Sequence, residues 1–279
     1  MIERVWIFHC GTMSVPRPLV ERGADFELAR MPFLGALVEH RERGPILIDA
    51  PFGHEGPANF GRMSAGLLKT FGLEFLSSWS VAARLEQMGH RTSDIDDVLL
   101  THLHGDHTGG LKTLGEATFH VSDIEWDFAR EISSLSAMVN GYAPDDYTSL
   151  APRVETFEMP PTLETAPEGL DLFGDGSIRA IGLPGHTIGH VGYRLTMADG
   201  RELFHVGDAV HSIDHIVDRR EPGTFPRTFA HDITRMEESL RMLRLFRDDH
   251  SDISLISAHD FDWCETCLEG PHIVHEVSS

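Results

Sequence analysis

Cysteine is scarce in this 279-residue chain, and long apolar runs are missing from it. Three cysteines are too few for a disulfide framework in a chain of this length. No apolar run approaches membrane-spanning length, and the N-terminus lacks a basic region followed by a long apolar core. Low-complexity runs and solenoid-type repeats are absent as well. We therefore expect a cytoplasmic globular protein with a single domain over residues 1–279.

Basic residues are also in short supply. The chain has 23 Lys and Arg against 44 Asp and Glu, which gives a formal net charge of −21. Such a surface repels phosphate backbones and anionic lipids. We therefore expect neither nucleic acid nor a membrane as a partner. The expected partner is a small-molecule substrate, and the net charge does not identify it.

The cysteines include one C-x-x-C pair, Cys264 and Cys267, shortly after His259. Zinc binding or redox activity are the functional interpretations of such a pair. No second cysteine pair completes a structural zinc site, and the strand-to-helix context of thioredoxin-type motifs is missing. The pattern favours two reduced thiols.

Apolar periodicity predicts alternating strands and helices in the first half of the chain. Strands are expected at residues 3–10, 33–40, 45–50, 95–100 and 117–121, and helices at residues 81–88 and 123–131. The long connection over residues 51–78 is rich in apolar side chains. These side chains could line a pocket, pack in the core or contact a partner subunit, and the pattern favours none of the three. They are Phe52, Phe60, Met63, Leu67 and Phe71.

In the second half, residues 132–152 show no periodicity and are predicted to be irregular. A second sheet is expected to begin after them. Its strands are predicted at residues 154–159, 170–173, 178–181, 191–196, 202–206 and 253–257. Helical spacing predicts an amphipathic helix at residues 232–246 that covers a sheet.

The most informative stretch follows the strand predicted at residues 95–100. It places His102, His104, Asp106 and His107 within six residues. His102 and His104 are two apart, so on an extended segment they point the same way and can bind one cation. The alternative is a solvated polar turn, but four metal-capable side chains in six residues favour a metal site.

Three further metal-capable side chains follow predicted strands. His186 and Asp208 each come directly after a glycine at a strand end, and His259 follows the strand at residues 253–257. The glycines permit close backbone approach. His186 is the expected third ligand of the cation held by His102 and His104.

In this order and spacing, the seven side chains resemble the ligand set of metallo-β-lactamase-fold hydrolases. The resemblance implies an α/β (α+β) fold, an αββα sandwich of two mixed sheets flanked by helices. Within that superfamily the chain is most similar to the N-acyl-homoserine lactone lactonases, the quorum-quenching enzymes. The matching features are residues 44–49, 102–110, 184–186, 207–209, 232–246 and 258–260.

The resemblance also implies roles for these residues. One metal ion would be held by His102, His104 and His186, a second by Asp106, His107 and His259, with Asp208 bridging them. The nitrogen and oxygen ligands suit two zinc ions, and iron, manganese or cobalt are chemically admissible. A metal-bridging hydroxide would open the lactone ring, and Asp106 would protonate the leaving oxygen.

One position departs from the lactonase pattern. Many such lactonases carry a Tyr three residues after the bridging Asp, and this chain has His211 there. A His can donate the same hydrogen bond to the substrate carbonyl, so His211 is predicted to be catalytic. At the position of Asp208 many true metallo-β-lactamases use Cys, which disfavours antibiotic hydrolysis. His190 is expected to make a supporting hydrogen bond.

Other functions stay open at this stage. A glyoxalase-II-like thioesterase or another ester hydrolase on the same scaffold is the nearest alternative. An iron enzyme resembling persulfide dioxygenases or flavodiiron proteins, and a metal-stabilised binding protein without turnover, are two more. A homodimer is compatible with the apolar side chains of residues 52–75. The resemblance also allows it, because lactonase-like proteins often form dimers.

Overall fold

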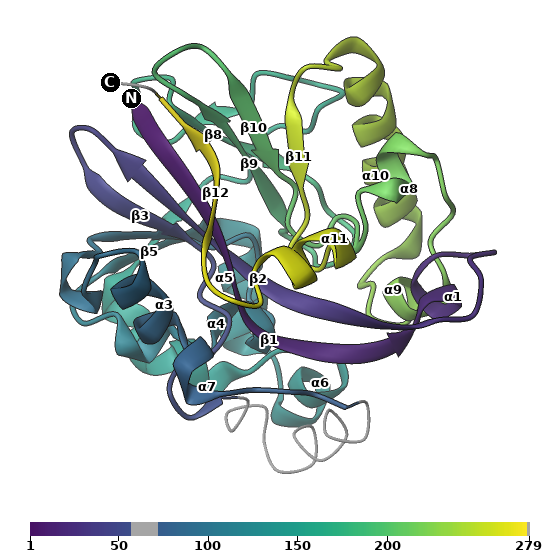
Figure 1. The fold of residues 1–279 in the computed structure, drawn as a ribbon, viewed down its shortest axis with the longest axis horizontal. Coiled ribbons are helices and arrows are strands. Elements are labelled where there is room, and N and C mark those ends of the chain that lie inside the picture. The colour runs from purple at the N-terminus through teal and green to yellow at the C-terminus, as the bar shows by residue number, and fades with distance from the viewer. Residues whose placement is uncertain (57–71, 278–279) are drawn as a thin grey trace.

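The computed structural model describes residues 1–56 and 72–277 of the chain. Within these ranges, a pair of β-sheets packs face to face, and helices cover the outer face of each sheet (Figure 1). The architecture is the αββα sandwich predicted from the sequence. No helix within the described ranges is long and apolar enough to cross a membrane.

The first sheet is mixed and contains seven strands within the described ranges. In spatial order they are β12 (His272–Glu276), β1 (Ile2–Pro16), β2 (Leu28–His40), β3 (Gly44–Ile48), β4 (Asp97–Leu99), β5 (Thr118–Ser122) and β6 (Val154–Phe157). Neighbours from β12 to β3 are antiparallel, and neighbours from β3 to β6 are parallel.

The second sheet has five strands among the described residues. Their order is β11 (Ser254–Ile256), β10 (Glu202–His205), β9 (Val191–Thr196), β8 (Ile178–Gly182) and β7 (Leu170–Asp171). β10 pairs parallel to β11, whereas β9 is antiparallel to both β8 and β10. The strands β8, β10 and β11 therefore all point in one direction.

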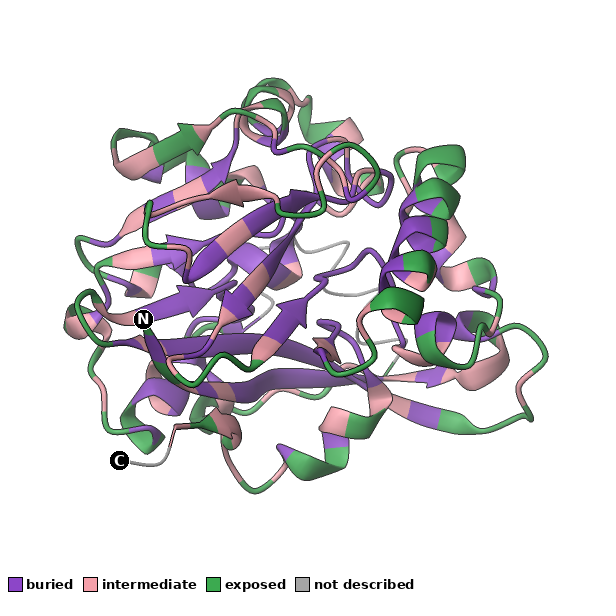
Figure 2. Ribbon diagram, turned by 90° about the horizontal axis from the view of Figure 1, so that it is seen from above, coloured by how far each residue is buried: buried purple, intermediate pink, exposed green. Residues whose placement is uncertain are grey.

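Alternation of side chains along the strands separates the core into layers. On β2, Leu34, Ala36 and Val38 face the interior between the two sheets, whereas Phe33 and Leu37 face the helices outside. Both sides of the strand are buried, so its sequence is apolar almost throughout. Figure 2 shows this continuous buried interior.

Helices bury the outer face of each sheet. The first sheet is covered by α3 (Val81–Gln87), α5 (Asp123–Glu131), α6 (Ser134–Val139) and α7 (Pro144–Tyr147). The second is covered by α8 (Asp214–Val217) and α10 (Ile233–Asp249). Met236, Leu240 and Leu243 lie on one face of α10, as the sequence pattern predicted, and the Asp232 side chain caps its first turn.

Several predicted boundaries differ from the structure. The first strand extends to Pro16, because it continues as an arm beyond the sheet. Val154–Phe157 belongs to the first sheet, where it pairs with β5, so the prediction that it begins the second sheet was wrong. Residues 132–152 are not irregular, since they contain α6, α7 and most of the 3-10 helix Thr148–Arg153. The strand His272–Glu276 was missed.

The apolar connection after β3 is only partly described. Phe52 is fully buried and packs in the core under the helices of the first sheet. The predictions for Phe60, Met63, Leu67 and Phe71 lie outside the described residues.

The ends of β1 and β2 form a paired extension that we call the hairpin arm, residues 12–32. It begins at a register shift between His9 and Thr12 and carries α1 (Arg17–Val20) near its tip. In Figure 1 the arm runs past the sheet to lie beside α9 (Thr224–Thr228). This extension forms one side of the site described next.

Candidate metal centre

Four loops bring the predicted ligands together at one edge of the sandwich. His102 and His104 follow β4, and α4 (Gly105–Thr108) carries the next pair of side chains. His186, Asp208 and His259 follow β8, β10 and β11, which point in the same direction and end at the same edge. The geometry therefore collects side chains separated by more than 150 residues in one place.

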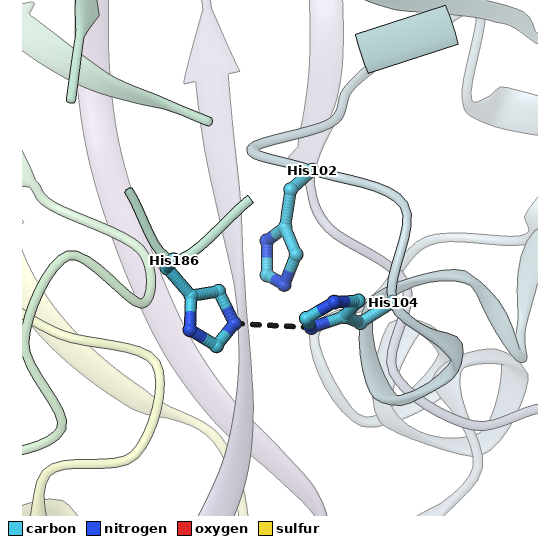
Figure 3. Close-up of side chains that lie close together, drawn as sticks. All are labelled: His102, His104 and His186. Carbon is cyan, nitrogen blue, oxygen red and sulfur yellow. Dashed lines mark hydrogen bonds between the residues drawn. The ribbon is translucent and has the colours of Figure 1, made fainter. Parts of the chain in front are cut away.

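The first cluster consists of His102, His104 and His186, whose candidate ligand atoms lie within 4.8 Å of one another. Figure 3 shows the three imidazole rings converging on one point. His186 Nε2 lies 3.0 Å from His104 Nδ1. All three side chains are buried.

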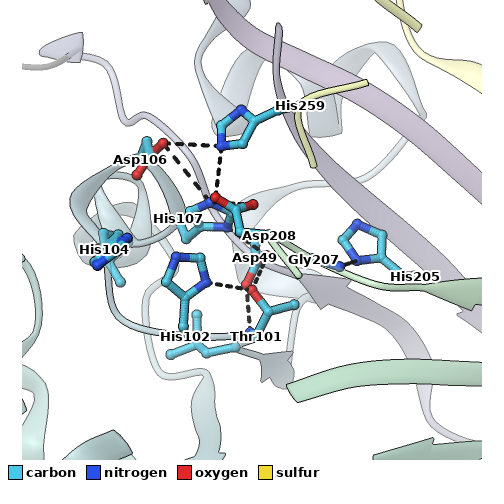
Figure 4. Close-up of polar contacts among 12 residues, drawn as sticks. Asp49, Thr101, His102, His104, Asp106, His107, His205, Gly207, Asp208 and His259 are labelled. Atoms are coloured by element: carbon cyan, nitrogen blue, oxygen red, sulfur yellow. Dashed lines mark hydrogen bonds and ion pairs between the residues drawn. The ribbon is translucent and has the colours of Figure 1, made fainter. Parts of the chain in front are cut away.

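The second cluster consists of Asp106, His107 and His259, which also meet within 4.8 Å. Asp208 lies between the two clusters (Figure 4). Its Oδ1 is 3.3 Å from His107 Nε2, and its Oδ2 is 2.9 Å from His259 Nε2 and 3.3 Å from His186 Nε2. The carboxylate therefore contacts members of both clusters.

Three buried polar atoms at the centre of these clusters have no hydrogen-bond partner among the described residues. They are His102 Nε2, His107 Nε2 and Asp208 Oδ1, of which the last two lie 3.3 Å apart as an ion pair without forming a hydrogen bond. A buried nitrogen or oxygen without a partner destabilises a fold, so atoms left in this state require an explanation. Nitrogen and oxygen atoms that converge in this way fit divalent metal ions.

Electrostatics separate the two clusters. Burial holds the pKa of His102 and His186 well below the ordinary value, and that of His104 falls to about 3, so these imidazoles are neutral. Burial also disfavours the charged form of His107, but the nearby Asp208 and Asp49 carboxylates outweigh it and raise the pKa of His107 well above its ordinary value. A neutral imidazole is the form that binds metal.

Asp49, at the end of β3, orients His107, a role that the sequence analysis did not assign. Its carboxylate accepts hydrogen bonds from the Thr101 amide and hydroxyl and from His107 Nδ1, each over 2.8 Å. The other ring nitrogen of His107 is thereby turned toward the clusters. Asp49 has a φ of 58°, which is uncommon outside glycine. The sequence offered one signal for this role, namely that Asp49 is a single acidic residue at the end of an apolar strand.

Glu125 on α5 connects two ligand loops and was likewise missed. The fully buried carboxylate accepts from the Leu103 amide over 3.1 Å, from the Gly189 amide over 2.9 Å and from the Tyr142 hydroxyl over 3.0 Å. Leu103 lies between two predicted ligands, and Gly189 lies in the loop of His186. Glu125 therefore fixes the two loops relative to each other.

His190 supports Asp208, as the sequence predicted. Its Nε2 accepts a hydrogen bond from the Asp208 amide over 3.0 Å. Gly207 has a φ of 55°, and a Cβ at this position would lie 2.6 Å from His190 Nε2. Only glycine allows this close approach.

His211 lies beside both clusters. Its ring stacks on His259 with centroids 5.1 Å apart and meets the His186 ring edge-on at 5.6 Å. A further group of close ligand atoms comprises His186, Asp208 and His211. The Nδ1 atom of His211 is buried and has no hydrogen-bond partner within the described stretches of the chain.

A pocket opens above the clusters, and its two apolar walls come from distant segments of the chain. The hairpin arm and the continuation of β2 contribute Met13, Met31 and Phe33. The opposite wall is formed by Phe225 on α9 and by the adjacent Phe229. The sequence analysis did not identify these wall residues, because each lies outside the recognisable motif.

The C-x-x-C cysteines take no part in this site. Cys264, Cys267 and Cys10 are all buried free thiols. Burial raises the pKa of Cys264 to about 11 and that of Cys267 to about 12, which keeps both protonated. The structure is consistent with the reduced thiols predicted from the sequence.

Comparison with known proteins agrees with this geometry. A family profile described as the metallo-beta-lactamase superfamily matches residues 37–249. A probable metallo-hydrolase of Mycobacterium tuberculosis is 28% identical over 284 residues, covering 93% of this chain and 81% of the relative. The N-acyl homoserine lactonase AttM of Agrobacterium fabrum is 26% identical over 277 residues, covering 93% of this chain and 94% of the relative.

Among solved structures, the chain is similar to an N-acyl homoserine lactone hydrolase with the product N-hexanoyl-L-homoserine bound at its catalytic metal centre. The TM-score is 0.72 at 17% sequence identity, and the match covers 96% of this chain and 97% of the other. At this level of identity the likeness concerns the fold.

Proposed function

This chain belongs to the metallo-beta-lactamase superfamily, and from that premise we propose that it is a dinuclear metal-dependent lactonase. Its substrates would be N-acyl homoserine lactones, so that its activity would quench quorum-sensing signals. The observation that carries the proposal is the meeting of seven His and Asp side chains, four with unpartnered buried atoms, at the floor of an apolar-walled pocket.

The ligand assignment follows the two clusters. We assign His102, His104 and His186 to one ion, Asp106, His107 and His259 to a second, and Asp208 to both. This mixture of nitrogen and oxygen donors suits zinc. When bound, two such ions would lower the pKa of a water molecule and polarise the substrate carbonyl.

The remaining steps are assigned to side chains that line the pocket. His211 would donate a hydrogen bond to the lactone carbonyl oxygen as negative charge develops on it. Asp106 also lines the pocket and would take the proton given up by the attacking water and deliver it to the ring oxygen when the ester bond breaks. The apolar walls would hold the acyl chain and keep water away from it.

The first test is proton release by the zinc-loaded protein with N-acyl homoserine lactones of several chain lengths, a γ-lactone and an acyl thioester. We expect turnover of the acyl homoserine lactones that stops after chelation and returns when zinc is restored. Turnover of the thioester alone would replace the proposal with the thioesterase alternative. Activity that survives complete metal removal would overturn the metal-dependent mechanism.

The role of His211 is tested by two substitutions of different chemistry. His211→Phe keeps a ring but removes the donor, and we expect kcat to fall roughly a hundredfold, as for loss of an oxyanion donor. His211→Tyr restores a donor and should recover most of that loss. Equal activity of the Phe and Tyr variants would contradict the assigned hydrogen bond.

A further inference from the structure

The hairpin arm contains a fully buried carboxylate, Glu21, that none of the steps above uses. Glu21 directly follows α1, and its side chain has no exposed surface. A buried carboxylate is strongly destabilising unless cations or hydrogen-bond donors surround it. Its partners therefore show which segments of the molecule depend on it.

Two arginine side chains hold this carboxylate. Arg17 donates from Nε over 3.1 Å, and Arg220 donates from Nη1 over 2.7 Å to the same oxygen. Burial acts to raise the pKa of Glu21, but these hydrogen bonds and a contribution from the Ser212 hydroxyl outweigh it, so the group stays ionised. Ser212 is the residue after His211, and Arg220 belongs to the same segment.

Backbone hydrogen bonds join the same two segments. The Arg22 amide donates to the Glu221 carbonyl over 2.8 Å, and the Gly223 amide donates to the Val20 carbonyl over 2.7 Å. These bonds flank the position of Glu21 on the arm. The tip of the arm is thus fixed to the chain that leads from His211 into α9.

A second carboxylate also holds this chain. The Ile213 amide donates to Asp260 Oδ2 over 3.1 Å. Ile213 is the second residue after His211, so the backbone close to His211 is fixed at this point. Phe225, farther along the chain, lies against His211 with ring centroids 6.0 Å apart.

We infer that Glu21 is a positioning residue: by holding Arg220, in the chain that leads from His211 into α9, it sets the orientation of His211 and of the α9 wall. The described lining of the pocket does not include Glu21, so it acts through other residues. The kinetic consequence rests on the proposed function, because His211 affects turnover only if it contacts the substrate.

The first experiment observes His211 without a substrate. Imidazole resonances of the zinc-loaded, ¹⁵N-histidine-labelled protein are recorded by NMR, and the His211→Phe spectrum identifies those of His211. Glu21→Gln removes the charge, and Ser212→Ala removes only the hydroxyl while keeping both arginine pairs. Asp218→Asn is the matched control, because Asp218 is 56% exposed and lies 3.8 Å from Arg220. We expect shifted or broadened His211 signals in the first two variants and unchanged signals in the control.

The second experiment is a double-mutant cycle with an acyl homoserine lactone. Glu21→Gln is expected to lower kcat roughly tenfold in the wild-type background, at unchanged zinc content. In the His211→Phe background the same change should cost less than about twofold, because the residue through which it acts is gone. A merely structural role would give the same loss in both backgrounds.

The outcomes separate the two proposals. If the wild-type protein turns over no lactone, the proposed function fails, and the NMR spectra alone decide whether Glu21 positions His211. Unchanged His211 signals in Ser212→Ala and Glu21→Gln would overturn the positioning role. If Glu21→Gln does not fold, Ser212→Ala replaces it in both experiments.

Discussion

The floor of the site and its walls are built on opposite principles. The floor consists of polar side chains at strand ends, and buried partners such as Asp49, Glu125 and His190 fix His107 and the loops that carry the others. The walls consist of apolar side chains on an arm and a short helix, Met13 and Phe225 among them, joined by contacts between distant segments. Under the proposed function, the floor would determine the class of reaction, and the walls would determine which molecule reaches it.

This difference predicts a hierarchy of mutational effects. A change in the floor removes a ligand or its orientation, so it should affect every substrate alike. A change in the walls removes contact area, so it should affect substrates according to their size and polarity. A change elsewhere in the core should affect stability without affecting either.

The largest effect is expected from Asp208→Asn, since this carboxylate contacts members of both clusters. An amide is a weaker ligand without charge, so turnover should fall by orders of magnitude for every ester tested. Metal content measured by mass spectrometry should fall toward one ion per chain. Asp248→Asn, the same exchange at a half-exposed surface position, is the control. Two retained ions and full turnover would contradict the bridging assignment.

A smaller effect on the floor is expected from Asp49→Asn. The new amide would present a donor to either Thr101 or His107, both of which donate to Asp49 in the wild type. Metal affinity, measured against a competing chelator, should fall about 10- to 100-fold. Thr101→Ser keeps the hydroxyl and should change the metal affinity little. An unchanged affinity in Asp49→Asn would mean that packing alone orients His107.

These two regions also differ in how far the sequence predicts them. Four floor residues fall within six positions, and His186, Asp208 and His259 follow strands, so local pattern was sufficient to find them. Asp49 and Glu125 were missed because nothing local distinguishes a carboxylate that accepts from distant amides from one that is solvated. Recognising them requires the three-dimensional positions of Thr101 and Gly189.

The walls could not be predicted for a stronger reason. Glu21 and Arg220 are 199 residues apart, and no periodicity in either segment indicates that they meet. Strands such as β1 and β2 were recognised, but their extension into an arm depends on pairing that continues past the register shift near Thr12. The element types were therefore predictable, whereas the surface they form against α9 was not.

The walls are tested by Phe225→Ala and Phe229→Ala. Phe225 lies against His211, and Phe229 is 37% exposed, so the first variant should have the larger effect. We expect KM for a medium-chain acyl homoserine lactone to rise about fivefold in Phe225→Ala, which corresponds to a fraction of the free energy of burying a phenyl ring. KM for a short-chain lactone should change less.

Phe26→Ala is the matched control for the walls, because Phe26 is 82% exposed in the loop after α1. It should leave both KM values unchanged. An equal rise of KM for short-chain and medium-chain lactones in Phe225→Ala would contradict the distinction between floor and walls, because the wall would then affect every substrate alike.

The smallest effect on activity is expected from His9→Gln, in the core beneath the first sheet. His9 is fully buried, and Arg84 donates to its Nε2 over 2.9 Å. Burial, with a contribution from the Arg84 charge, lowers the pKa of His9 from 6.5 to about 3. Between these values the unfolded chain binds a proton that the folded chain does not, so stability is lost as the pH falls from 6.5 toward 3.

His9→Gln removes this proton uptake, so the free energy of unfolding of the variant should fall less steeply with acid than that of the wild type. Urea unfolding of the metal-free proteins between about pH 7 and pH 5 measures both slopes, and the histidines of the two clusters contribute equally to each. We expect the slopes to differ while the kcat of the zinc-loaded proteins stays the same. Parallel slopes would mean that His9 takes up its proton in the folded state, and a lower kcat would show that this region of the core does reach the floor.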